Sequence, residues 1–139
     1  MLFADLNPPS PKFNSLDELF AAMTQMTDDP LANAGTNVVI SRGNPGARIL
    51  IIGEAPGPQE NIQGKPFVGR AGQLLDQILR TVKFDPEKDV FIANSVFRMP
   101  PGEAGKAFRK PNIDEINFYR KHVLEIIRLM DPQILLLTG

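Results

Sequence analysis

Short apolar runs and longer amphipathic segments alternate along this chain. The apolar runs predict strands at residues 48–52, 89–94 and 134–137, with a further short strand at 38–40. These runs are nearly continuous and do not alternate with polar residues, which is typical of parallel strands buried on both faces. The pattern therefore favours a sheet inside the protein.

Helical periodicity appears in three segments: 15–26, 71–82 and 112–130. Ser15 with Glu18, and Asn112 with Glu115, have the spacing of a capping box, and Pro132 predicts the end of the last helix. One apolar stripe is expected to face the core along the second helix, formed by Leu74, Leu75, Ile78, Leu79 and Val82.

Strands that alternate with amphipathic helices predict an α/β fold with three α/β/α layers and a mainly parallel central sheet. We expect a single domain over residues 1–139, in which 1–37 form an N-terminal helical and irregular lead-in. The sequence stops directly after the strand at 134–137, where such a fold continues with a helix. The pattern thus predicts a domain that is truncated at its C-terminus.

Composition narrows the chemistry. The chain has 139 residues, a net charge of −1 and no cysteine. The missing cysteines exclude disulfides, thiolate metal sites, cysteine-ligated iron–sulfur clusters and a cysteine nucleophile, so we expect no metal and no cofactor. The N-terminus lacks the basic and apolar regions of a secretory signal, which makes a cytoplasmic protein the expectation.

The segment 53–70, which follows the strand at 48–52, is rich in glycine and proline. Such a loop holds one shape and lets another group approach its main chain closely. It is either a stiff connector or a binding loop. A phosphate cradle is a further alternative, although neither G-x-x-x-x-G-K-[ST] nor a tight G-x-G-x-x-G is present.

The side chains of this loop suggest recognition of a flat ligand. Glu54 and Glu60 could orient or activate water, and Phe67 could stack on a ring. Asn94 ends the next strand, and its amide offers a donor beside an acceptor, which matches the edge of a pyrimidine. The alternative for Asn94 is a cap on its own loop.

The following loop, 95–111, is locally basic. Arg98, Lys106, Arg109 and Lys110 stand there against Glu103 alone. These cations could contact DNA phosphates, or the loop could simply be solvated.

These residues together resemble the family 4 branch of the uracil-DNA glycosylase superfamily. The chain reads GEAPG from Gly53, then Glu60, then GKPFVGRAGQLL over 64–75, each matching the family pattern. "IANSVFRMPPG" and "RKPNIDEI" are similar to two later family segments, so the resemblance covers residues 38–139.

The resemblance implies that the chain removes uracil from DNA by hydrolysing the bond between deoxyribose and base. Phe67 would stack on a flipped-out uracil, and Asn94 would hydrogen-bond its edge. Glu54 would help to place the attacking water as the catalytic residue, and Glu60 would shape the pocket. The main chain at Gly53 and Ala55 would complete the substrate-binding wall.

The chain also departs from the family pattern. Family 4 proteins carry four cysteines that hold a 4Fe–4S cluster; here LANAGTN (31–37) and Arg98 stand at cysteine positions, and Phe118 or Tyr119 would take the last. The family's C-terminal histidine–proline motif is missing. His122 lies within a predicted helix, where we expect a surface or boundary role.

Three hypotheses remain. The chain is a uracil-DNA glycosylase acting on uracil-containing DNA in base excision repair, or a catalytically impaired relative that binds nucleic acid or has a structural role. An unrelated nucleotide-binding α/β protein is opposed by the long motif. If the chain is complete, we expect a homodimer through the exposed sheet edge at 134–137.

Overall fold

The computed structural model of the chain describes residues 13–139. Its helices are α1 (Leu16–Thr24), α2 (Pro58–Gln63), α3 (Arg70–Thr81) and α4 (Ile113–Met130), with a short 3₁₀ helix η1 (Ala32–Ala34). Its strands are β1 (Ser41–Gly43), β2 (Ile49–Gly53), β3 (Val90–Asn94) and β4 (Ile134–Leu137). Residues 1–12 of the helical and irregular lead-in predicted at 1–37 lie outside the described residues.

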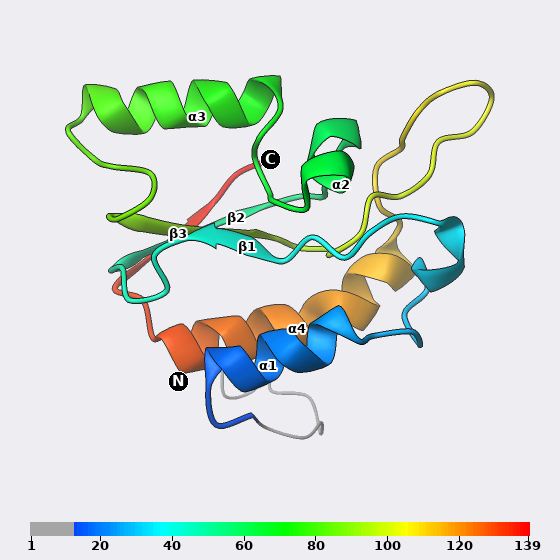
Figure 1. Ribbon diagram of the computed structural model, residues 1–139, viewed down its shortest axis with the longest axis horizontal. Coiled ribbons are helices and arrows are strands. Elements are labelled where there is room, and N and C mark those ends of the chain that lie inside the picture. The colour runs from blue at the N-terminus through cyan, green and yellow to red at the C-terminus, as the bar shows by residue number, and fades with distance from the viewer. Residues whose placement is uncertain (1–12) are drawn as a thin grey trace.

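The strands form a single sheet in the order β1-β3-β2-β4. β2 pairs in parallel with both β3 and β4, while β1 runs antiparallel to β3. Figure 1 shows α1 and α4 on one side of the sheet and α2 and α3 on the other. The predicted three-layer α/β/α fold with a mainly parallel sheet is therefore confirmed.

Two loops leave the sheet at the carboxyl ends of its two central strands. β2 and β3 are neighbours, and their last residues, Gly53 and Asn94, are paired in register. The segment after Gly53 and the segment after Asn94 thus start side by side at the carboxyl ends of parallel strands. In open α/β sheets, this is the edge where ligands bind.

The core has two halves, one on each face of the sheet. Leu50 and Ile52 of β2 pack toward α1 and α4, in a cluster that includes Tyr119. Ile51 points to the opposite face and packs with Leu79 of α3. Successive side chains of a strand alternate between faces, so a continuous apolar run supplies both halves.

Helix caps agree with the sequence patterns. The Ser15 side chain accepts the N–H of Glu18 at 3.2 Å and opens α1. Asn112 and Glu115 form both halves of a capping box at the start of α4. α4 ends at Met130, before Pro132, as predicted.

Two local predictions were wrong. The strand expected at 38–40 is absent, and the strand in this region is β1 at 41–43. β1 is polar, and pairing with β3 rather than its own apolar pattern makes it a strand. The loop after Gly53 also holds α2, which has no helical stripe in the sequence.

The expected burial of β4 was wrong, and that of the α3 stripe holds only for Leu75 and Leu79. In β4, Leu137 is 70% exposed, and in α3 Leu74 and Ile78 are 57% and 54% exposed. β4 forms one edge of the sheet, and no helix within residues 13–139 covers the outward side of these segments. The homodimer through this edge stays an untested prediction. No helix in the described part of the chain is long and apolar enough to cross a lipid bilayer.

Candidate functional site

Gly53, Phe67 and Asn94 converge where β2 and β3 end. A Cβ added to Gly53 would lie 2.3 Å from Cζ of Phe67 and 2.6 Å from Oδ1 of Asn94. Both side chains therefore approach the main chain of Gly53 so closely that only glycine fits between them. The sequence placed these residues in two separate segments, and the structure brings them together.

The Asn94 side chain is buried without a partner. Only 2% of its surface is exposed, and no residue within 13–139 hydrogen-bonds to its amide. A cap on its own loop, the alternative interpretation, would show such a bond. A buried amide with free donor and acceptor groups is costly unless a ligand or water satisfies it. Such a group is typical of a binding site.

Phe67 has a strained backbone. Its φ of 56° lies in the left-handed region, which is rare for a bulky residue. Its ring packs against the apolar cluster under α3. Strain of this kind persists only where surrounding contacts enforce it, and it concentrates at functional sites.

Arg42 of β1 supplies one of these contacts. Its Nε donates to the carbonyl oxygen of Pro66 and its Nη2 to that of Phe67, each at 2.8 Å. Nη2 also donates to Asp76 of α3. Gly72 supplies the other contact, since a Cβ there would lie 1.8 Å from the Phe67 carbonyl oxygen. Arg42 and Gly72 thus fix the Phe67 backbone between β1 and α3.

Glu60 of α2 holds the other side of this loop. One carboxylate oxygen accepts the N–H groups of Val68 and Gly69 at 2.9 and 2.6 Å, and the other accepts that of Gly57. Gly69 caps the start of α3, so the carboxylate already occupies that helix N-terminus. The arrangement disfavours the phosphate cradle, because Glu60 already accepts the N–H groups of Gly57, Val68 and Gly69.

Glu54 and Ala55 follow Gly53 and differ in exposure. The Glu54 side chain is exposed and has no hydrogen bond or ion pair with any of residues 13–139. Its main chain is fixed, since its carbonyl oxygen accepts the N–H of Val96 at 3.2 Å. Ala55 packs against the core beneath the sheet. Ser95 ties the two loops together by donating both its N–H and its hydroxyl to the Gly53 carbonyl oxygen.

The prediction that Arg98 contacts DNA phosphate is corrected by its surroundings. Arg98 is only 9% exposed. Its guanidinium donates inward to Asp29 and to the carbonyl oxygens of Met26 and Thr36. A buried cation whose groups face the protein interior is not available to a DNA backbone.

The remaining basic residues of this loop lie nearer the surface. Lys106 and Lys110 are exposed, and neither forms an ion pair within the described chain. Arg109 forms a two-pronged pair with Glu115 at 2.8 Å for each contact. The hydrogen bond from Arg109 lowers the pKa of Glu115 despite its burial. Arg109 is therefore partly neutralised, whereas both lysines keep a free charge.

His122 lies at the boundary between α4 and the core. Its ring lies near those of Phe97, Phe118 and Tyr119. Burial lowers its pKa, and the positive charge of Lys121 lowers it further. The histidine packs on the face of the sheet that carries α4, away from α3 and Phe67, so the expected boundary role agrees with its position.

Sequence reasoning missed Arg42 and Ser95, and it gave no role to Gly72. Arg42 lies outside every element predicted from the sequence, and its partners lie 24 to 34 residues away. No local pattern signals such contacts. Gly72 was visible as part of the long motif, but only the close approach of the Phe67 carbonyl explains it.

The fold and its geometry define an α/β protein in which Gly53, Phe67 and Asn94 converge at the carboxyl ends of two central parallel strands. The family described as the uracil DNA glycosylase superfamily matches residues 40–139. The chain belongs to this superfamily, and the resemblance noted in its sequence is confirmed.

Three relatives are named type-4 uracil-DNA glycosylases. The protein of Saccharolobus solfataricus is 40% identical over 74% of this chain and 45% of its own length. That of Thermotoga maritima is 38% identical over 79% of this chain and 54% of its own. The Archaeoglobus fulgidus protein is 31% identical over 90% of this chain and 60% of its own. The chain thus spans about half the length of the curated relatives it matches.

Proposed function

We propose that this chain carries the base-recognition site of a uracil-DNA glycosylase and hydrolyses the N-glycosidic bond of deoxyuridine in DNA. The observation that carries the proposal is the buried Asn94 side-chain amide, which lies beside the Phe67 ring and has no hydrogen-bond partner among residues 13–139. A uracil flipped out of the helix offers a flat face to stack on and an edge with adjacent donor and acceptor groups. Membership of the superfamily and the similarity to type-4 enzymes support it.

In this proposal each residue has a separate task. Phe67 stacks on the base, Asn94 hydrogen-bonds its edge, and Gly53 lets both approach. Glu54, whose side chain is exposed and whose main chain is fixed, helps to place the attacking water. Glu60 contacts no substrate but holds the loop that carries Phe67.

The reaction consumes one water molecule. The water oxygen bonds to C1′ of deoxyribose while the bond from C1′ to N1 of uracil breaks, and uracil leaves with the electron pair. A water proton ends on the departing base. Loss of the base leaves an abasic site in the strand. The transition state has oxocarbenium character, as in other glycoside hydrolysis. Rejection of the thymine methyl by pocket shape alone supplies only about 1–3 kcal/mol.

The exposed lysines Lys106 and Lys110, with Arg109, form the proposed DNA-phosphate contacts, and Arg98 is not among them. They lie in the loop that leaves β3 at the same sheet edge as the Phe67 loop. Each freed phosphate counterion contributes to binding, so binding should weaken as salt rises.

Uracil release from a duplex with a single U·G pair tests this proposal. We expect release by the unaltered chain in single-turnover conditions, and a reduction of roughly 10²-fold or more for Asn94→Asp, which replaces the amide donor by a negative charge. Asn117→Asp, at an exposed position of α4, is the matched control and should leave the rate unchanged. If the folded chain releases no uracil but binds the duplex, the impaired-relative hypothesis replaces the proposal.

A further inference from the structure

A buried charged network joins three separate parts of the chain. Asp29 has a fully buried side chain, and one of its carboxylate oxygens accepts the Nε–H of Arg98 at 2.7 Å. The same oxygen accepts the hydroxyl of Tyr119. Asp29 precedes η1, Arg98 follows β3, and Tyr119 belongs to α4. Burial and the neighbouring carboxylate raise the pKa of Tyr119, which keeps its hydroxyl a donor.

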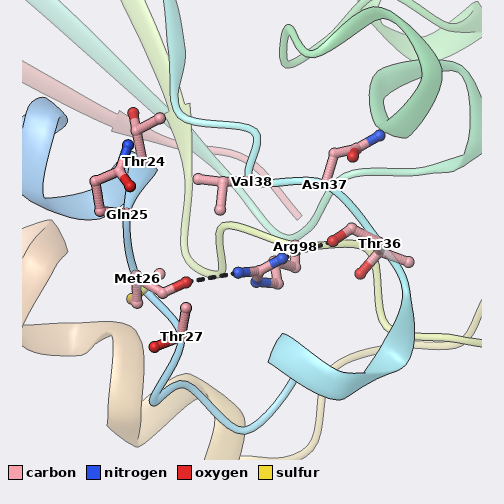
Figure 2. Close-up of a pocket in the computed structure, with 8 residues that line it drawn as sticks. All are labelled: Thr24, Gln25, Met26, Thr27, Thr36, Asn37, Val38 and Arg98. Carbon is pink, nitrogen blue, oxygen red and sulfur yellow. Dashed lines mark hydrogen bonds between the residues drawn. The ribbon is translucent and has the colours of Figure 1, made fainter.

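Arg98 also holds both ends of the segment that contains Asp29. Its Nη2 donates to the Met26 carbonyl oxygen at 2.8 Å and its Nη1 to that of Thr36 at 2.6 Å. Figure 2 shows the guanidinium lying between these two residues. A pocket of about 420 Å³ borders them, while Met26 and Leu31 of the same segment are buried in the core on the other side.

The residues in this region do not fit the iron–sulfur cluster that the resemblance implies. Such a cluster is held by thiolates. Segment 31–37, position 98 and position 119 do come together here, as cysteine positions would. The groups that bond in the network around Asp29 are the Arg98 guanidinium, the Tyr119 phenol and the Thr36 carbonyl oxygen. A salt bridge therefore stands where the family pattern expects a metal centre.

The segment held by Arg98 leads directly to the proposed uracil site. Asn37 follows Thr36, and its N–H donates to Oδ1 of Asn61 at 2.7 Å. Its side-chain amide donates back to the Asn61 carbonyl oxygen at 2.8 Å. Asn61 lies in α2, next to Glu60, whose carboxylate holds the loop of Phe67. Hydrogen bonds, together with the peptide bond between Thr36 and Asn37, thus connect Arg98 to α2.

We infer that the Asp29–Arg98–Tyr119 network is a metal-free clamp that positions α2, and through it the Phe67 loop, by fastening segment 26–37. Arg98 is thus a positioning residue. The part that concerns base recognition rests on the proposed function, whereas the part that concerns α2 does not.

Hydrogen exchange tests the clamp without reference to catalysis. Arg98→Lys keeps the charge but cannot reach Asp29 and two carbonyl oxygens together. We expect exchange of the α2 and Val68–Gly69 amides to speed up by about tenfold or more, because local opening there becomes easier. Arg120→Lys, exposed on α4, is the matched control. Unchanged exchange in a folded Arg98→Lys protein would overturn the inference.

Arg98→Met is the harsher variant, since it leaves the Asp29 carboxylate buried and unpaired. We expect Tm to fall by roughly 10 °C or more. Asn61→Ala, in contrast, removes a single partner of Asn37 at a more exposed position and should leave the fold intact. In a double-mutant cycle with Arg98→Lys, the exchange effects should be non-additive, although residues 61 and 98 form no bond with each other. Strictly additive effects of the two substitutions on hydrogen exchange would contradict the inference that Arg98 and Asn61 act through the same contacts.

Kinetics separate the clamp from the alternative that Arg98 binds phosphate. As a positioning residue, Arg98→Lys should lower kcat for uracil release while KM and the salt dependence of DNA binding stay unchanged. A phosphate contact predicts the reverse: a raised KM and a shallower salt slope in Arg98→Met. If exchange responds as expected but the unaltered chain releases no uracil, the proposed function fails while the clamp stands. Stoichiometric iron uptake on anaerobic reconstitution with iron and sulfide would refute its metal-free character.

Discussion

Replacing Gly53 by alanine adds one carbon atom, and so tests how closely Phe67 and Asn94 pack against this position. A Cβ there would lie 2.3 and 2.5 Å from two ring carbons of Phe67 and 2.6 Å from Oδ1 of Asn94. Ordinary carbon contacts need at least about 3.5 Å. The ring must therefore move by more than about 1 Å, or the two strand ends must separate. Gly53 is not in a left-handed conformation, so the effect is steric and not one of backbone strain.

The displacement sets the size of the expected effect. Overpacking at a tightly filled site costs about 1–3 kcal/mol, which should lower Tm by several degrees. A misplacement of about 1 Å in a group that positions the substrate costs on the order of 10²-fold in rate. We therefore expect Gly53→Ala to remain folded while single-turnover uracil release falls by about two orders of magnitude.

The control and the refuting result are both available in this chain. Gly46 is exposed, and a Cβ there would lie 3.3 Å from a single side-chain oxygen, that of Asn44. Gly46→Ala should change stability by less than about 0.5 kcal/mol and leave release unchanged. A Gly53→Ala protein with the Tm and release rate of the unaltered chain would show that Phe67 and Asn94 do not form one packed site.

Three further predictions concern the loop, the histidine and the lysines. Glu60→Gln puts an amide donor against main-chain N–H groups and should cost about 1–3 kcal/mol in urea unfolding; an unchanged midpoint would contradict the role assigned to this carboxylate. His122 is held neutral because burial lowers its pKa, whereas the unfolded chain takes up a proton below about pH 6.5. The contribution of His122 to the free energy of unfolding is therefore complete above that pH and is lost as pH falls toward the lowered pKa. This loss should be smaller in His122→Gln, which unfolding measurements from pH 5 to 8 would reveal. Lys106→Ala and Lys110→Ala should each reduce the slope of log binding constant against log salt by about 1, and a slope that matches the unaltered chain would remove that lysine from the interface.

Several elements follow from local sequence because their signals are local. β2 and β3 are short apolar runs, and α1 and α4 begin at capping residues whose partners lie three positions away. The alternation of strands and helices is enough to predict the layered α/β fold. The long motif from Gly53 to Leu75 also identified the family, since its residues are adjacent in the chain.

The site itself could be predicted only in part. The chemistry of Phe67 and Asn94 was readable from their residue types and from their places near strand ends. Their shared contact at Gly53 depends on the pairing of β2 with β3, which joins positions 41 residues apart. The strained φ of Phe67 and the contacts of Arg42 that sustain it have no counterpart in the local pattern.

Sequence alone thus determined the layers of this protein, its family and the residue types of its proposed site. Tertiary structure decided which charges face inward. Arg98 and Lys106 looked alike as cations of one basic loop, yet Arg98 is buried against Asp29, a partner 69 residues away, while Lys106 stays exposed. The physical reason is that burial and ion pairing depend on what the folded chain brings alongside each side chain, and a residue's neighbours in sequence do not specify it.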